Sequence, residues 1–225
     1  SGNLGDDATI RLASRIARVV IGGGLITETE ESKLAQKVKL EPVDHARLSD
    51  VANGKTASHS ASCAGAMRHA DRLVALLSRT VPVEIMPGAS DATNCFLPQQ
   101  PIHPLMLREA AKTNAMRLVT NPFQFETNLS FTTSRSDSSS SSSSTFLVSS
   151  GQNVSDVVRQ TSLTSVQAMQ SLLRWGHLCP TAPNTLPCFP FKESDPFVIR
   201  QSPHCFVACN QEKFDSAWKD GVRYV

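Results

Sequence analysis

The side chains that could do chemistry gather in the loop after residues Val81–Met86, whose alternating apolar residues predict a short strand. Pro87 and Gly88 end that pattern, and Ser90 and Asp91 follow closely. In open α/β sheets, the loop that leaves the carboxyl end of a strand is where ligands and catalytic groups usually lie. A serine nucleophile and a metal-binding carboxylate are therefore the two chemistries to weigh.

The serine hypothesis rests on residues 88–92, Gly-Ala-Ser-Asp-Ala, which come nearest to the Gly-x-Ser-x-Gly motif of hydrolases. Their last position is alanine instead of glycine, so the sequence does not indicate the sharp turn that exposes such a nucleophile. The many other serines leave a triad of a different form open as an alternative.

A second loop of interest is Gly22–Gly24, which follows a predicted strand at Arg18–Ile21. Three glycines after a strand can cradle a phosphate, or they can form a tight turn that needs positive φ angles. A dinucleotide fingerprint would place glycine or alanine at Thr27, and the acidic residues that begin at Glu28 would repel a phosphate. We therefore predict a tight turn.

Cysteine and histidine side chains raise the question of a zinc site. Six residues of the second half are conceivable ligands: His177, Cys179, Cys188, His204, Cys205 and Cys209. No Cys-x2-Cys pair occurs, although that spacing is typical of structural zinc sites. Cysteine is also commonly a small buried residue, so we predict no metal and no cofactor.

The overall charge is too small to attract nucleic acid or an acidic membrane through a strong electrostatic field. The 225 residues carry 22 Lys and Arg against 20 Asp and Glu, a net charge of +2, so any DNA contact must be local. No apolar run is long enough to span a bilayer, and scattered cysteines without a signal peptide favour a reducing intracellular compartment. The length suits one domain with its own core.

The loops described above depend on a predicted βαβ unit. Residues Ala61–Arg79 give the clearest helical pattern, with an apolar stripe. The stripe is formed by Met67, Ala70, Leu73, Val74 and Leu77. This helix would join the strands at Arg18–Ile21 and Val81–Met86, which predicts a parallel pair. The polar residues Val51–His59 predict an exposed loop.

The second half predicts more strands and helices around a low-complexity insertion. Residues 132–145 contain the run Ser138–Ser144, which cannot offset its ordering entropy by burial, so we predict a disordered insertion. The other predicted elements are strands at Ala115–Thr120, Phe146–Ser149 and Cys205–Cys209, and helices at Leu105–Lys112, Asn153–Arg159 and Ser162–Trp175. This order predicts an α/β fold.

A proline-rich, aromatic segment lies at His177–Phe197. Its prolines exclude long helices and predict a rigid, extended surface loop. Phe189, Phe191 and Phe197 need burial, and a protein partner is one way to provide it.

Five sequence blocks, in order, resemble the small (B) subunits of eukaryotic replicative DNA polymerases. They are Met86–Thr93, Leu97–Pro104, Leu118–Pro122, Ser150–Asp156 and His177–Leu186. The resemblance covers most of Ser1 to Ala217, and Leu-Pro-Gln-Gln-Pro at Leu97–Pro101 favours the delta type over the alpha and epsilon types.

The resemblance implies a calcineurin-like metallophosphoesterase fold, with mixed β sheets flanked by helices, over residues 1–225. In the family an oligonucleotide-binding-type barrel precedes this domain. The chain begins on Ser1 instead of methionine and ends on the strand-like Gly221–Val225. We therefore expect a fragment that is truncated at both ends.

Active members of that fold hold two metal ions with four conserved stations of Asp, Asn and His. By the resemblance, Ser1–Asn3 stands at the first station, Gly24 at the bridging aspartate, Gly88–Asp91 at the third station and Cys209–Glu212 at the last. Asp91 alone keeps a ligand carboxylate, and one carboxylate does not hold two ions. We therefore expect no catalytic residue, because the residues of a site are better evidence of function than the fold that carries them.

The resemblance implies a nuclear accessory subunit of DNA polymerase delta in DNA replication. Its expected partners are the C-terminal metal-binding domain of the catalytic subunit and a third subunit that reaches the sliding clamp, with DNA contacted only indirectly or weakly and no membrane. The predicted contact residues are Pro87, Gly88, Leu97, Pro98, Gln99, Gln100, Pro101, His177, Phe189, Phe191 and Phe197. Rigid exposed apolar groups of this kind are common interface anchors.

Two other functions stay open from the sequence. The chain could be a divergent metal-dependent phosphodiesterase that acts on nucleotides or DNA ends. It could also be a scaffold outside replication, built on the same silent fold.

Overall fold

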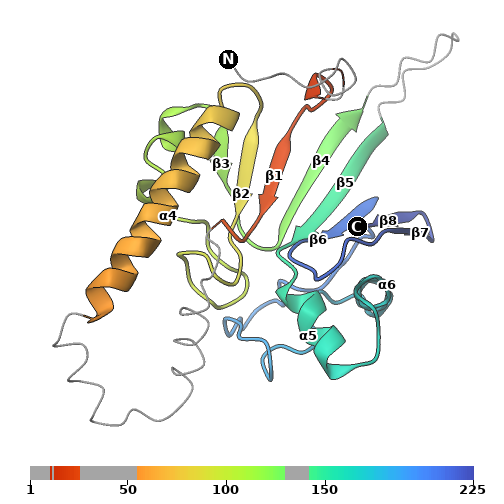
Figure 1. Cartoon of the computed structure of the whole chain (residues 1–225). Coiled ribbons are helices and arrows are strands. Elements are labelled where there is room, and N and C mark those ends of the chain that lie inside the picture. Colours follow the sequence, from red (N-terminus) through yellow and green to blue (C-terminus); the bar gives the residue numbers. More distant parts are fainter. Residues whose placement is uncertain (1–10, 12, 26–54, 130–141) are drawn as a thin grey trace, which may run out of the picture.

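The structure is a computed structural model that describes residues 11, 13–25, 55–129 and 142–225 (Figure 1). Its elements are β1 (Val19–Gly22), α4 (Lys55–Leu77), β2 (Val83–Met86), the 3-10 turns η2 (Pro104–Met106) and η3 (Ala110–Lys112), β3 (Met116–Leu118), β4 (Phe123–Leu129), β5 (Ser142–Ser149), α5 (Gln152–Gln160), α6 (Ser165–Trp175), β6 (Cys205–Ala208), β7 (Ala217–Lys219) and β8 (Val222–Tyr224). Two sheets flanked by helices confirm the predicted mixed α/β fold.

The first sheet is the predicted βαβ unit with one more strand. Its order is β1-β2-β3, and both pairs are parallel, with Val19 opposite Val83 and Val83 opposite Met116. Parallel neighbours need a crossover connection, and α4 stands between β1 and β2 in the chain. The loops that follow β1 and β2 therefore leave the sheet at the same edge.

The helix α4 begins earlier than predicted, and the face that covers the sheet is rotated from the predicted stripe, of which Met67, Ala70 and Val74 are buried. The predicted loop at Val51–His59 is wrong from Lys55 onward. Of the predicted stripe, Leu73 and Leu77 are 50% and 43% exposed. The buried residues are Met67, Ala70, Asp71, Val74, Ala75 and Ser78. Because apolar residues occur on both sides of this helix, its periodicity alone does not choose the side that meets the sheet.

The second sheet has the order β4-β5-β6-β8-β7. β4 pairs antiparallel with β5, and β7 with β8, whereas β5, β6 and β8 are parallel. The predicted insertion at 132–145 is wrong at its end, because Ser142 and Thr145 pair with Leu129 and Glu126 in this sheet. A neighbouring strand satisfies the backbone of these serines. Residues 132–141 lie outside the described residues.

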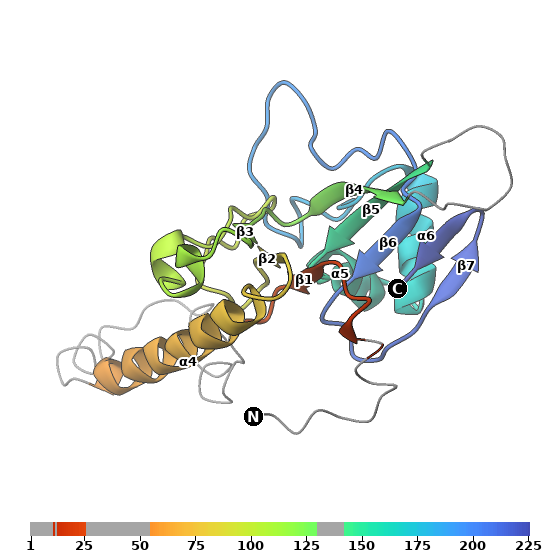
Figure 2. The ribbon, with the colours of Figure 1, turned by 90° about the horizontal axis from the view of Figure 1, so that it is seen from above.

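The helices α5 and α6 pack against the second sheet and form the larger core with it (Figure 2). Thr164 begins α6 with a capping box, in which its hydroxyl accepts the amide hydrogen of Gln167 and the Gln167 side chain accepts that of Thr164. Gly176 ends the helix at φ 68°. The capped helix buries Met169 and Leu172 in the core.

No helix or strand forms within residues 178–197, as predicted. An antiparallel bridge between His177 and Val198 closes the segment into a loop. In the described part of the chain, no helix combines the length and the apolar character needed to cross a membrane.

Candidate functional site

Four loops meet at the carboxyl ends of β1, β2, β5 and β6, where an open sheet normally binds its ligand. They contain Gly22–Gly24, Pro87–Asp91, Ser150–Gly151 and Cys209–Gln211. A Cβ atom on Gly23 would lie 2.5 Å from the Ser150 hydroxyl and 2.6 Å from the Gly88 Cα. The loops therefore touch through their backbones, which only glycine permits at this separation. Gly23 and Gly24 have φ angles of 88° and 71°, as predicted for a tight turn.

The carboxylate of Asp91 joins two of these loops. Its Oδ2 atom accepts the amide hydrogens of Gly24 at 2.9 Å and of Gly88 at 2.8 Å. The side chain is buried. Two backbone N–H groups thus occupy an oxygen that a metallophosphoesterase would present to a cation.

The side chain of Asn210 joins the loops on the other side. Its Nδ2 atom donates to the carbonyl of Gly22 at 2.9 Å and to the carbonyl of Ser150 at 3.0 Å, and it lies 3.2 Å from the Ser150 hydroxyl. Asn210 adopts φ 54°, a left-handed conformation that asparagine tolerates better than most residues. The side-chain amide of Asn210 therefore lies between the carbonyl oxygens of Gly22 and Ser150 and links their two loops.

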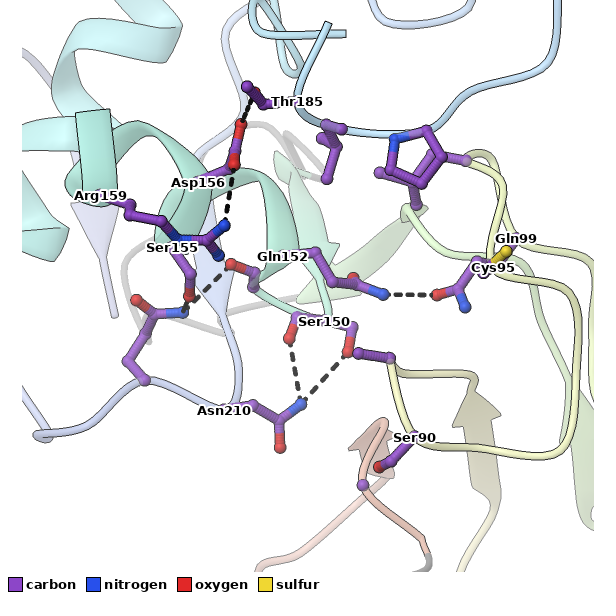
Figure 3. A pocket seen from close by; sticks show the side chains of 17 residues that line it. Ser90, Cys95, Gln99, Ser150, Gln152, Ser155, Asp156, Arg159, Thr185 and Asn210 are labelled. Atoms are coloured by element: carbon purple, nitrogen blue, oxygen red, sulfur yellow. Dashed lines mark hydrogen bonds and ion pairs between the residues drawn. The ribbon is translucent and has the colours of Figure 1, made fainter. Parts of the chain in front are cut away.

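A cavity of about 880 Å³ opens beside these loops (Figure 3). Asp156 of α5 accepts a hydrogen bond from the Thr185 hydroxyl at 2.6 Å and lies 3.6 Å from the guanidinium of Arg159. Arg159, a positively charged residue of the cavity lining, is thus already paired with the carboxylate of Asp156. Among the described residues, no histidine lines the cavity, so its walls offer no imidazole base to a serine nucleophile.

A network of three side-chain amides supports the floor of this cavity. Nδ2 of Asn121 donates to Oε1 of Gln99 at 2.7 Å and to Oε1 of Gln152 at 2.8 Å. Nε2 of Gln99 donates to the carbonyls of Gly88 and Asn94. Gln99 and Asn121 are each 1% exposed. Buried amides linked in this way fix the loops relative to one another.

Three of the four expected metal stations come together. The Gly24, Gly88–Asp91 and Cys209–Glu212 segments meet in space, and Ser1–Asn3 lies outside the described residues. Within the described ranges, no group of three or more His, Cys, Asp or Glu side chains could hold a metal ion. Burial raises the pKa of the thiols of Cys179 and Cys209, which opposes their use as thiolate ligands.

The first predicted contact segment is mostly internal. Pro87, Gly88, Leu97 and Gln99 are buried, Pro98 and Pro101 are half-buried, and Gln100 is exposed. The four buried residues lie in the interior, so Pro98, Gln100 and Pro101 are the members of this segment that offer surface to a partner. Gln99 exchanges backbone hydrogen bonds with Asn121, Leu97 pairs with the Pro187–Phe189 segment, and Gly88 lies against Gly23 and Ser150.

The second predicted segment is divided. Phe189 and Phe191 are 37% and 53% exposed, whereas Phe197 is 4% exposed and belongs to the core of the second sheet. Phe189 and Phe191 therefore offer surface to a partner, whereas Phe197 offers almost none. His177 is half-buried.

The exposed parts of the two segments lie side by side. The amide of Leu97 donates to the carbonyl of Pro187 at 3.0 Å, and the amide of Phe189 donates to the carbonyl of Leu97 at 3.0 Å. The ring centroids of Phe96 and Phe189 are 5.6 Å apart, and those of Phe189 and Phe191 are 6.5 Å apart. These three rings form an exposed aromatic cluster. Sequence reasoning missed Phe96, although its position beside Leu97 in the same loop was a usable signal.

His177 fastens the aromatic segment. Its Nδ1 accepts the amide hydrogen of Cys179, so Nε2 carries the proton and donates to Oδ2 of Asp195 at 2.8 Å. Oδ1 of Asp195 accepts the amide hydrogen of Phe197 at 2.8 Å. The hydrogen bond from His177 and, second, that from Phe197 lower the pKa of Asp195.

Comparison with known proteins gives a consistent set of relatives. A family model that describes the B subunit of DNA polymerase alpha/epsilon matches residues 8–216. The chain is 34% identical over 222 residues to "DNA polymerase delta subunit 2" of Drosophila melanogaster, which covers 98% of the chain and 44% of that protein. It is 30% identical over 223 residues to "DNA polymerase delta small subunit" of Oryza sativa subsp. japonica, covering 99% and 45%. It is 32% identical over 217 residues to the protein of that name in Arabidopsis thaliana, covering 96% and 42%.

The chain thus spans less than half the length of these curated relatives. The matched range contains all five sequence blocks that carried the resemblance.

Proposed function

The chain belongs to the family of DNA polymerase alpha/epsilon B subunits, and we propose that it acts in DNA replication as a non-catalytic accessory subunit of DNA polymerase delta in the nucleus. The names of its relatives support the delta type. On this proposal, residues 1–225 are one inactive phosphoesterase domain that uses its surfaces to hold other subunits together.

The hydrogen bonds from two backbone amides to the Asp91 carboxylate are the observation that supports a non-catalytic role. Two-metal hydrolysis needs oxygens that are free to bridge and clamp two cations. Here Oδ2 of Asp91 already accepts two amide hydrogens, at 2.9 Å and 2.8 Å. A cation at that oxygen would have to displace both hydrogen bonds and would leave two N–H groups beside a positive charge.

The proposed partners are the C-terminal metal-binding domain of the catalytic subunit and a third, clamp-linked subunit, with DNA contacted only indirectly or weakly. The aromatic cluster of Phe96, Phe189 and Phe191 is the best supported contact surface for the catalytic subunit. Large rings that are partly exposed and held on a rigid loop lose little entropy when a partner covers them. Gln100 lies exposed next to the same loop and would contribute to the rim.

Co-purification tests this proposal. Full-length protein with both Phe189→Ala and Phe191→Ala should recover at least about tenfold less catalytic subunit than the unmodified protein, as expected when aromatic anchors are lost. Phe214→Ala is the matched control, because Phe214 is 86% exposed elsewhere on the surface. Undiminished recovery by the double variant would remove the aromatic cluster from the proposal.

The two alternatives make different predictions. A divergent phosphodiesterase would bind divalent metal and hydrolyse a phosphate ester. A scaffold outside replication would recover other proteins in stoichiometric amounts and no polymerase delta subunit, so identifying what co-purifies separates this role from the proposed one.

A further inference from the structure

The helix α4 presents an apolar surface that nothing in the described part of the chain covers. Leu73, Leu76 and Leu77 are 50%, 57% and 43% exposed. They lie in the last two turns of α4. The helix itself stands at the side of the molecule away from the second sheet (Figures 1 and 2). Three neighbouring exposed leucines are more than the scattered apolar residues of an ordinary surface.

The spacing of this surface is that of a helix-packing seam. Ala66, His69, Leu73 and Leu76 follow one another at intervals of three, four and three residues, and Leu77 widens the same stripe. The opposite side of α4 is buried against the first sheet through Met67, Val74 and Ala75. The helix therefore has two apolar sides, of which the described part of the chain covers one.

Positive charge borders the stripe. Arg72 and Arg79 are exposed, and on a helix with 3.6 residues per turn they fall along one flank of the leucines. Asp71 is the only acidic residue between positions 65 and 80. It is buried and accepts the amide hydrogens of Glu109 and Ala110 at 2.9 Å and 2.8 Å, so it adds no carboxylate to this face.

We propose that the exposed face of α4, formed by Ala66, His69, Leu73, Leu76 and Leu77, is a docking site for an acidic amphipathic helix of a partner protein. Leucines spaced three and four residues apart accept the apolar side of such a helix. The arginine flank attracts glutamate or aspartate on its edge. This surface is distinct from the aromatic cluster, and the proposal does not depend on polymerase delta being the partner.

The same features disfavour other occupants. A second copy of this chain would place arginine flank against arginine flank, or would cover the leucines without pairing the charges. Nucleic acid would satisfy the arginines, but its phosphates would leave the three leucines exposed to water.

Site-specific photo-crosslinking in the full-length protein tests the proposal. Benzoylphenylalanine is placed at Leu76 and, as a control, at Trp218, which is 66% exposed on β7. After irradiation in cells, the crosslinked peptides are sequenced. The expected result at position 76 is one segment of another protein, acidic overall, with apolar residues three and four positions apart.

Binding of that segment, made as a fluorescent peptide, then measures each part of the face. Leu73→Gln with Leu76→Gln should weaken binding at least tenfold, and Arg72→Glu with Arg79→Glu at least fivefold, with the charge effect shrinking as salt rises. Val198→Gln is the matched control at another exposed apolar residue and should leave binding unchanged. Unchanged melting temperatures would show that the exposed substitutions do not unfold the chain.

Several outcomes would overturn the proposal. They are a crosslink to nucleic acid, to a non-acidic segment, to another part of the same chain or to a second copy, and no crosslink above that of Trp218. Recovery of no polymerase delta subunit by the full-length protein, together with the expected crosslink at position 76, would reject only the polymerase assignment, so the two failures are distinguishable.

Discussion

The side-chain amide of Asn121 donates a 2.7 Å hydrogen bond to Oε1 of Gln99, and both residues are almost completely buried. Gln152 joins them by accepting from Asn121 and donating to Gln99. Each of these residues belongs to a different sequence block of the family resemblance. The three blocks thus meet in one hydrogen-bond network. Amide side chains suit these positions because each amide can donate and accept hydrogen bonds.

The network predicts that Gln99→Leu destabilises the fold. The substitution removes the Gln99 side-chain donor from the carbonyls of Gly88 and Asn94 and leaves the Asn121 amide with one of its two hydrogen bonds, which should cost about 1–3 kcal/mol for buried polar groups. Urea unfolding followed by circular dichroism measures it. Gln100→Ala changes the exposed neighbour and should stay within about 0.5 kcal/mol; equal effects of the two substitutions would argue against the network.

Asn210 should matter through both its hydrogen bonds and its backbone. Asn210→Ala loses the bonds to Gly22 and Ser150 and forces alanine into φ 54°, a conformation that costs a residue with a Cβ roughly 1–2 kcal/mol. Asn210→Gly loses the same bonds without that strain. We expect the alanine variant to unfold at lower urea than the glycine variant, and both to unfold below the unmodified chain. If the glycine variant matches the unmodified chain, the bonds contribute nothing.

Two glycine substitutions should act in opposite directions. Gly23→Ala would bring a Cβ to 2.5 Å from the Ser150 hydroxyl and 2.6 Å from the Gly88 Cα at φ 88°, so a loss of about 2 kcal/mol or more is expected. Gly65 lies in α4, where a Cβ atom would meet nothing within 4 Å, and Gly65→Ala should stabilise by about 0.5–1 kcal/mol. Thermal melting compares them, and a neutral Gly23→Ala would contradict the close approach of the loops.

The pH dependence of the aromatic segment follows from Asp195. Its pKa is lower in the folded chain than in the unfolded chain, chiefly because His177 donates a hydrogen bond to it. The resulting stabilisation is present above the unfolded pKa and is lost as the pH falls through the folded pKa. Asp195→Asn should therefore lower the melting temperature at pH 7, and this difference should shrink toward acid. A difference that is constant with pH would contradict the role of Asp195.

The sequence predicted the elements better than it predicted burial. The strands at Arg18–Ile21 and Val81–Met86 and the helix between them were recognisable because their periodicities are local properties. Leu97 and Gln99 looked like an exposed proline-rich loop, since their burial depends on distant partners: Leu97 pairs with the Pro187–Phe189 segment and Gln99 with Asn121. Phe197 could not be distinguished from Phe191 by composition, because Phe197 joins the core beside a bridge between His177 and Val198, which are far apart in the sequence.

The positions of the candidate site were predictable from the sequence, and its hydrogen bonds were less so. Gly24 and the segments at Asp91 and Asn210 were expected at the metal stations of the fold, and they do meet. What the sequence did not indicate is that Asp91 and Asn210 hold the loops together by accepting and donating hydrogen bonds. Such roles depend on the positions of backbone groups that no sequence motif encodes.

The most direct measurement of the central claim is the metal content and phosphodiesterase activity of the full-length protein. Protein saturated with manganese and then passed through a desalting column is assayed by plasma mass spectrometry and with bis-nitrophenyl phosphate, beside an Asp91→Ala variant. An accessory subunit whose Asp91 is bound to backbone amides predicts no stoichiometric metal and no turnover above buffer in either protein. Two manganese ions per chain, with turnover that chelation and Asp91→Ala both abolish, would contradict the account.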